Sequence, residues 1–174
     1  MTKAIPVLVF IAALTVPAGG QPPPSIQGVW RNVERVIPAA TAPGERSDPF
    51  AHVPPGTQTN VQPGLLIFTK HHYSRTTDTA VEPRPKLDPT SAAPTVGELQ
   101  ARWGPFQANA GTYEVSGDTV TLQPFVAKEP REQGGGSFAR LTVRLEANAL
   151  SLTPIASSRG RIVAGVTSKY VRVE

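Results

Sequence analysis

The feature that most constrains this chain is an alternation of apolar and polar side chains within residues 138–146. Leu141, Val143 and Leu145 are apolar, and the residues between them are charged or carry a hydroxyl group. Successive side chains of a β-strand point to opposite faces, whereas apolar residues of a helix recur every three or four positions. The pattern therefore predicts a strand with one buried and one solvated face.

Other segments combine β-branched or aromatic residues with turn signals at their ends. The strands predicted in this way, besides 138–146, span residues 26–37, 64–70, 71–79, 106–116, 119–127, 149–155 and 166–174. Gly117 lies between two of them, where a tight hairpin needs a positive φ. The sequence thus predicts about eight strands, most of them joined by short turns.

One segment has the pattern of a helix, from residue 96 to residue 103. Thr95 precedes it and Glu98 lies three residues later, which is the arrangement of a capping box. Gly104 and Pro105 end it, because glycine and proline are poor at continuing a helix. A single short helix among many strands indicates an all-β fold.

The spacing of the strands decides how they pair. Two parallel strands need a crossover of a dozen or more residues, and the spacing from residue 106 onward does not allow one. An antiparallel barrel or sandwich remains, and closure is favoured because eight strands leave an interior that holds side chains or one small ligand. Proline-rich stretches at 38–63 and 82–94 predict irregular loops. The first is long enough to act as a lid.

The amino-terminal residues are typical of a secretory signal. Lys3 precedes an apolar run, and small residues follow it up to Gly20, so we expect a signal peptide at 1–20 and a secreted or periplasmic protein. Residues 21–25 predict a proline-rich tether, and 26–174 predict one barrel domain. The chain contains no cysteine, so disulfides cannot contribute to its stability.

The charge and the remaining motifs exclude several classes of protein. A net charge of +4 with scattered arginines is not the clustered basic surface of a nucleic-acid-binding protein. His71 and His72 are adjacent, so in a strand they point to opposite faces, and His52 lies in the long loop. We therefore predict no metal site. Calcium, haem and nucleotide patterns are absent from the sequence, and no cofactor is predicted.

Four segments resemble the bacterial lipocalin-like domain family, whose members are small secreted barrels of the calycin type. They are GVW (28–30), QPGLLIFTKHHYS (62–74), NAGTYEVSGDTVTLQP (109–124) and KYVRVE (169–174). The resemblance implies that Gly28 and Trp30 begin the first strand, that Trp30 closes the narrow end of the barrel, and that Arg172 of the last strand lies over its ring.

Side chains on the predicted strands are candidates to line a ligand pocket. These candidates are Phe68, Tyr73, Tyr113, Phe125, Leu141, Val143 and Leu145. The two tyrosines combine an apolar ring with a hydroxyl group that could orient the polar end of a ligand. The alternative is that all seven fill a solid core, as side chains do in the smallest barrels.

Glu34 shows whether side chains alternate regularly along the first predicted strand. Simple alternation places it on the same face as Trp30, and a buried carboxylate needs a basic partner such as Arg75 or Arg144. The alternative is a β-bulge that turns Glu34 to solvent.

The leading functional hypothesis is a non-catalytic, exported barrel that binds or sequesters a small, mainly apolar molecule. We expect a monomer that does not bind nucleic acid and has no membrane span. A rival is an isomerase or cyclase that uses Tyr113, Tyr73 or Glu34 as general acid or base. A third hypothesis is an interaction protein that meets its partner through the proline-rich loops.

Overall fold

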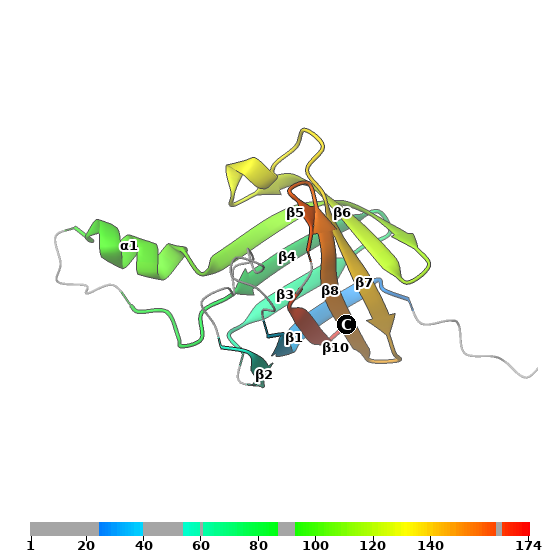
Figure 1. Ribbon diagram of the computed structural model, residues 1–174, viewed down its shortest axis with the longest axis horizontal. Helices are drawn as coiled ribbons and strands as arrows, with labels where there is room; N and C mark the ends of the chain where they lie inside the picture. The colour runs from blue at the N-terminus through cyan, green and yellow to red at the C-terminus, as the bar shows by residue number, and fades with distance from the viewer. Residues whose placement is uncertain (1–24, 40–53, 60, 87–92, 163–164) are drawn as a thin grey trace, which may run out of the picture.

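The computed structural model describes residues 25–39, 54–59, 61–86, 93–162 and 165–174. Eight antiparallel strands form its closed barrel (Figure 1). These strands are β1 (Gly28–Ile37), β3 (Gly64–Phe68), β4 (His72–Asp78), β5 (Phe106–Ser116), β6 (Thr119–Ala127), β7 (Ala139–Leu145), β8 (Ala149–Ser157) and β10 (Thr167–Arg172). The predicted all-β antiparallel barrel is confirmed.

The barrel closes because β10 pairs with two strands. Each of the other barrel strands pairs with its neighbour in the chain, and β10 pairs with β8 on one side and with β1 on the other. Trp30 of β1 lies opposite Arg172 of β10. The first and last strands are therefore neighbours, and each of the eight barrel strands pairs with another strand on both of its sides.

The two ends of the barrel differ in their connections. Tight turns join β3 to β4, β5 to β6 and β7 to β8 at one end, which also carries the start of β1 and the end of β10. The longer connections join strands at the opposite end. They span residues 38–63, 79–105, 128–138 and 158–166. We call these the closed end and the open end.

Trp30 occupies the closed end. Its ring is fully buried, and its Nε1–H donates to the Ile26 carbonyl oxygen at 2.8 Å. The Arg172 guanidinium carbon lies 4.2 Å from the centre of the Trp30 ring, and its nitrogens donate to the carbonyl oxygens of Ser25 and Gln27, both at 2.6 Å. A cation over an aromatic face contributes about 0.5–2 kcal/mol, more when desolvated. The amino-terminal segment is thus tied to the last strand.

A β-bulge decides the direction of Glu34. The pairing of β1 with β10 shifts between Asn32 and Glu34, so Arg35 is buried and Glu34 pairs with Lys169, with 2.6 Å between Oε1 and Nζ. The expectation that Glu34 points inward toward Arg75 or Arg144 is wrong. The extra residue of a bulge reverses the alternation beyond it, as the second interpretation of this strand required.

The predicted helix is confirmed as α1 (Val96–Trp103), with the reciprocal capping hydrogen bonds of Thr95 and Glu98. It projects from the barrel with none of its residues buried (Figure 1). Lys128, after β6, donates to the carbonyl oxygens of Trp103, Gly104 and Phe106. The carboxyl end of α1 is thereby attached to the barrel.

Three short elements at the open end were not predicted. They are β2 (Gly56–Gln58), β9 (Gly160–Arg161) and the 3-10 turn η1 (Pro130–Glu132). Strand β2 pairs with the end of β1, and β9 pairs with the end of β8. Each is a short additional strand outside the eight-strand ring. The signal peptide, all but the last residue of the tether and the centre of the 38–63 loop lie outside the described residues.

Candidate functional site

A cavity of about 240 Å³ occupies the half of the barrel nearest the open end. One part of its lining is apolar. The buried aliphatic side chains of this part are Leu66, Leu122, Leu141, Leu152 and Val166, which come from four strands and the residue before β10. All five are nearly inaccessible to solvent. The interior is thus divided into a packed half at the closed end and a hollow half at the open end.

The other part of the lining is polar. Its hydroxyl, amide and charged side chains are Tyr73, Arg75, Thr77, Thr79, Gln107, Asn109, Glu132, Ser137, Ser157, Ser158, Arg159, Ser168 and Tyr170. Glu132 and Arg159 pair with each other at 3.3 Å. A lining of buried aliphatic side chains together with polar groups is the usual make-up of a small-molecule site.

Two tyrosines face the cavity as neutral hydroxyl groups. Burial raises the pKa of Tyr73 to about 12; the positive charge of Arg75 opposes this rise and Glu132 adds to it. Burial also raises the pKa of Tyr170, against the charge of Arg75 and a hydrogen bond with Ser168. Because a raised pKa keeps the proton on the phenol, both residues are hydrogen-bonding hydroxyl groups, not bases, at neutral pH.

The seven predicted lining residues separate into three groups. Tyr73 and Leu141 line the cavity. The side chains that lie instead in or against the packed core are Phe68, Tyr113, Val143 and Leu145. Phe68 and Tyr113 pack edge to face with their ring centres 4.8 Å apart, and the Tyr113 hydroxyl donates to the Thr69 carbonyl oxygen at 2.7 Å. Filled core and hollow pocket are therefore both present, in different halves of one barrel.

The prediction for Phe125 is wrong. This residue is 56% exposed and its ring packs against His72 on the outside of the barrel. Pro124 pairs with Gly111 while the next ladder pair joins Val126 to Ala110, so Phe125 is the extra residue of a bulge. A bulged residue leaves the alternation, and the direction of its side chain cannot be obtained by counting along the strand.

Apart from Tyr73, the polar lining residues were not among the seven candidates. Arg75 and Thr77 follow Tyr73 at intervals of two on β4, so strict alternation could have placed them inside. Asn109 lies opposite Arg75 in the neighbouring strand β5. Its Oδ1 atom is buried and accepts no hydrogen bond within the described part of the chain. That alternation along β4 was a signal available from the sequence alone.

The catalytic candidates are not brought together. Tyr113 is in the closed half of the barrel, and Glu34 lies on the outer face with Lys169. Of the three, Tyr73 alone lines the cavity. A general acid and base pair built from these residues would need both groups near one bound molecule. Their positions give the isomerase or cyclase hypothesis no such pair.

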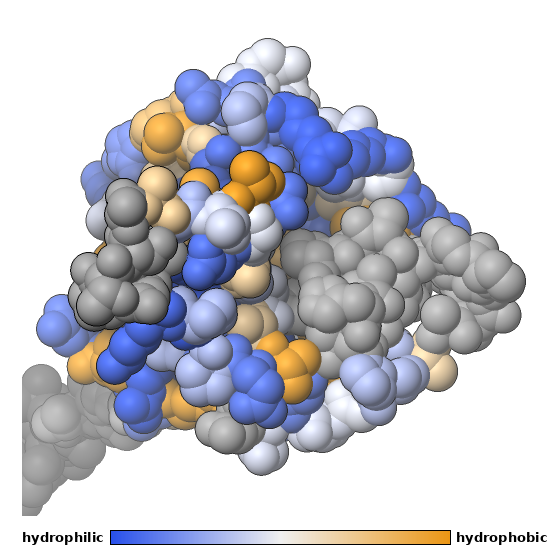
Figure 2. Space-filling model, turned by 90° about the vertical axis from the view of Figure 1, so that its left-hand side faces the viewer, coloured by the Kyte–Doolittle hydropathy of each residue, from blue (hydrophilic) through white to orange (hydrophobic). Residues whose placement is uncertain are grey.

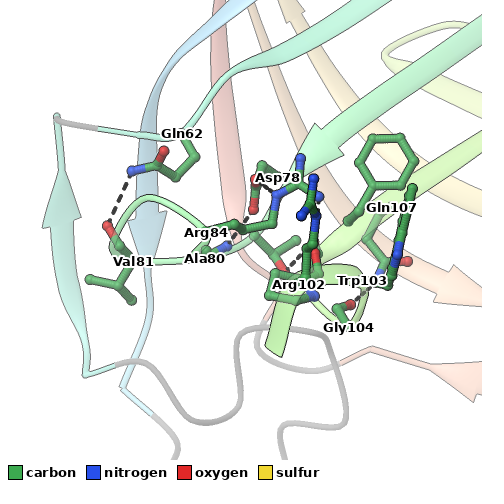
Figure 3. Close-up of polar contacts among 12 residues, drawn as sticks. Gln62, Asp78, Ala80, Val81, Arg84, Arg102, Trp103, Gly104 and Gln107 are labelled. Atoms are coloured by element: carbon green, nitrogen blue, oxygen red, sulfur yellow. Dashed lines mark hydrogen bonds and ion pairs between the residues drawn. The ribbon is translucent and has the colours of Figure 1, made fainter. Parts of the chain in front are cut away.

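A larger hollow of about 1130 Å³ lies outside the barrel, beside the open-end parts of β1, β3 and β4. Figure 3 shows the contacts at its wall: Arg84 lies between the Asp78 carboxylate, to which its Nε donates, and the Arg102 carbonyl oxygen at 3.0 Å. The Ala80 N–H donates to the same carboxylate at 3.0 Å. These groups hydrogen-bond to one another, so their contacts hold the connection from β4 to α1 in place.

One face of the outer surface carries no continuous apolar patch among its described residues. On the face shown in Figure 2, apolar residues form separate spots among hydrophilic ones, as is usual for surfaces in water. No group of three or more potential metal ligands occurs in the described ranges. No helix in these ranges is both long and apolar enough to cross a bilayer.

Comparison with known proteins does not assign the chain to a family. No protein-family model matches the chain, and no curated protein sequence matches it.

Proposed function

We propose that this chain is an exported, lipocalin-like barrel that binds and carries a small, mainly apolar molecule. The observation that supports binding is the 240 Å³ cavity, with its aliphatic and polar lining, toward the end of the barrel where the longer connections lie. Binding sites in β-barrels commonly lie at such mouths. The signal-like residues 1–20 support export, and the four family-like segments support the lipocalin-like assignment.

The size of the cavity limits the ligand. An engineered cavity of about 150 Å³ in another protein holds one benzene molecule. Scaled from that case, 240 Å³ accepts a molecule of roughly ten non-hydrogen atoms. The ligand of this barrel is therefore a short chain or a single ring rather than a large lipid. An eight-carbon chain with one polar end group has the right size for a test.

The test is isothermal titration calorimetry of the folded barrel with octan-1-ol, compared with a variant that fills the cavity. Ala139 lines the cavity, so Ala139→Phe places a ring inside it. The matched control is Ala101→Phe, which adds the same ring to the exposed surface of α1. We expect one binding site, weakened on the order of tenfold or more by Ala139→Phe and unchanged by the control.

Thermal unfolding of both variants shows whether the added ring disturbs the fold, since overpacking a filled interior usually destabilises a protein. The proposal is contradicted if octan-1-ol and the charged octyl compounds used below all fail to bind the folded protein. It is also contradicted if Ala139→Phe folds normally and binds as well as the parent chain.

A further inference from the structure

We infer that the cavity selects a molecule with a monoanionic carboxylate head group, which Arg75 binds. This inference rests on the proposed function and names its ligand class. Arg75 points into the cavity from the middle of β4, between Tyr73 and Thr77 on the same face of the strand. It belongs to the polar part of the lining and lies opposite Leu66, an aliphatic residue of the cavity, in the β3–β4 register. A ligand whose apolar tail packs against the aliphatic side chains can therefore present its head group to Arg75.

Among the described charged residues that line the cavity, Arg75 is the cation without an anionic partner. Within the described part of the chain, its side chain takes part in no ion pair and no hydrogen bond. The neighbouring acids are already paired: Glu132 with Arg159, and Asp78 with Arg84. A partly buried cation without a partner has lost part of its hydration, and no protein anion compensates for that loss. A bound anion would supply the missing electrostatic interaction.

The surrounding groups suit a carboxylate. The hydroxyl of Tyr73 has no hydrogen-bond partner among the described residues and keeps its proton at neutral pH, so it can donate to an oxygen beside Arg75. The unsatisfied amide of Asn109 lies opposite Arg75 in the β4–β5 register. Rotation of that amide exchanges its acceptor for a donor. Guanidinium and carboxylate can also form two parallel hydrogen bonds, which adds a preferred orientation.

The charge balance favours one negative charge. The charged residues that line the cavity are Arg75, Glu132 and Arg159, and the last two form a pair. The described lining therefore carries one uncompensated positive charge. A monoanion neutralises it, whereas a phosphate monoester would bring a second negative charge close to Glu132. A carboxylate thus fits better than a phosphate.

The experiment compares four ligands that share one tail. Octanoate, octan-1-ol, octylamine and octyl phosphate are titrated into the folded chain by calorimetry at pH 7.5 and constant ionic strength, where octanoate is ionised. We expect octanoate to bind on the order of tenfold more tightly than octan-1-ol, and octylamine to bind more weakly than the alcohol. The alcohol measures the binding of the tail alone.

Arg75→Gln removes the charge, and we expect it to bring the affinity ratio of octanoate to octan-1-ol close to one while octan-1-ol still binds. Arg75→Lys keeps a charge and should keep most of the preference. Arg144→Gln is the matched control, because Arg144 is exposed on the outer face of β7. Each ratio is taken within one variant, so a moderate loss of stability cancels.

The outcomes separate this inference from the proposed function. If no octyl compound binds, the proposed function fails. If octan-1-ol binds but octanoate binds no better, or if Arg75→Gln keeps the full preference, the inference fails and the carrier function stands. Tighter binding of octyl phosphate than of octanoate would also overturn the assignment to a carboxylate.

Discussion

Gly111 on β5 and Gly165 before β10 are the residues that make room for the bulged strands around the cavity. A Cβ atom on Gly111 would lie 2.0 Å from the Gln123 carbonyl oxygen, and one on Gly165 would lie 2.1 Å from the Pro154 carbonyl oxygen. Both contacts are with backbone, so a larger residue would have to move a strand. Proline lacks the N–H needed for a ladder hydrogen bond and is accommodated at bulges. At residue scale, glycine therefore permits close approach of the backbone beside the bulges, and Gly165 also lines the cavity.

Gly111→Ala is expected to lower the free energy of unfolding by about 1–3 kcal/mol, because the added methyl group displaces β6 at the bulge. Gly97→Ala in α1 is the control, since a Cβ there meets nothing within 4 Å. Alanine has the higher helix propensity, so the control should be neutral or slightly stabilising. Urea denaturation of both variants measures the difference. Equal midpoints would refute the role given to Gly111.

The helix α1 and the barrel strands depend on different interactions. The strands are held by ladder pairing and by a shared core, whereas α1 buries no residue and depends on its cap and on hydrogen bonds from Lys128 and Arg84. The cap is electrostatic as well as geometric, because hydrogen bonds from the Thr95 backbone and side chain lower the pKa of Glu98. At element scale, α1 is thus an attachment that can unfold without the barrel.

Thr95→Ala is expected to destabilise α1 by about 1 kcal/mol through loss of the cap. The barrel should unfold within about 0.5 kcal/mol of the parent chain, since no core contact is lost. Hydrogen exchange at the amides of Leu99 and Gly104, which donate within the helix, reports on α1 separately from the strands. Val96→Ala, at an exposed helical position, serves as the control. A matching loss of barrel stability would show that α1 belongs to the same cooperative unit.

The molecule as a whole depends on β10, which closes the ring. It joins β1 to β8 and places Arg172 over Trp30, so the two termini of the domain stabilise each other. The pairing also joins segments far apart in the chain, which costs much conformational entropy before the contacts form. Closure is therefore the step on which the cooperativity of the whole barrel depends.

Deletion of residues 167–174 should abolish cooperative thermal unfolding, because it leaves two unpaired edges and exposes Trp30. Deletion of residues 173–174 is the graded control. It removes the backbone hydrogen bonds between Val29 and the last two residues, and each such bond contributes about 1 kcal/mol. Circular dichroism during heating distinguishes the two deletions. A cooperative transition in the longer deletion would contradict the account of closure.

The local sequence pattern alone determined where regular structure begins and ends in much of the chain. The predicted helix 96–103 and the predicted strands 106–116 and 119–127 match the structure at both ends. Alternation, glycine turns and capping residues are properties of neighbouring residues, so a sequence displays them directly. The antiparallel pairing followed from the short spacing between these strands, and the count of eight strands favoured a closed barrel over a sandwich.

Only the tertiary structure decided which side chains reach the cavity. Phe125 and Glu34 face outward because bulges shift the register against a partner strand, and that register depends on residues distant in the chain. Arg75 lines the cavity, whereas the sequence offered it only as a possible partner of Glu34. The hollow itself depends on the summed volume of side chains from all eight strands. A local pattern can predict that a strand has an inner face, but the closed ring decides whether that face meets another side chain or open space.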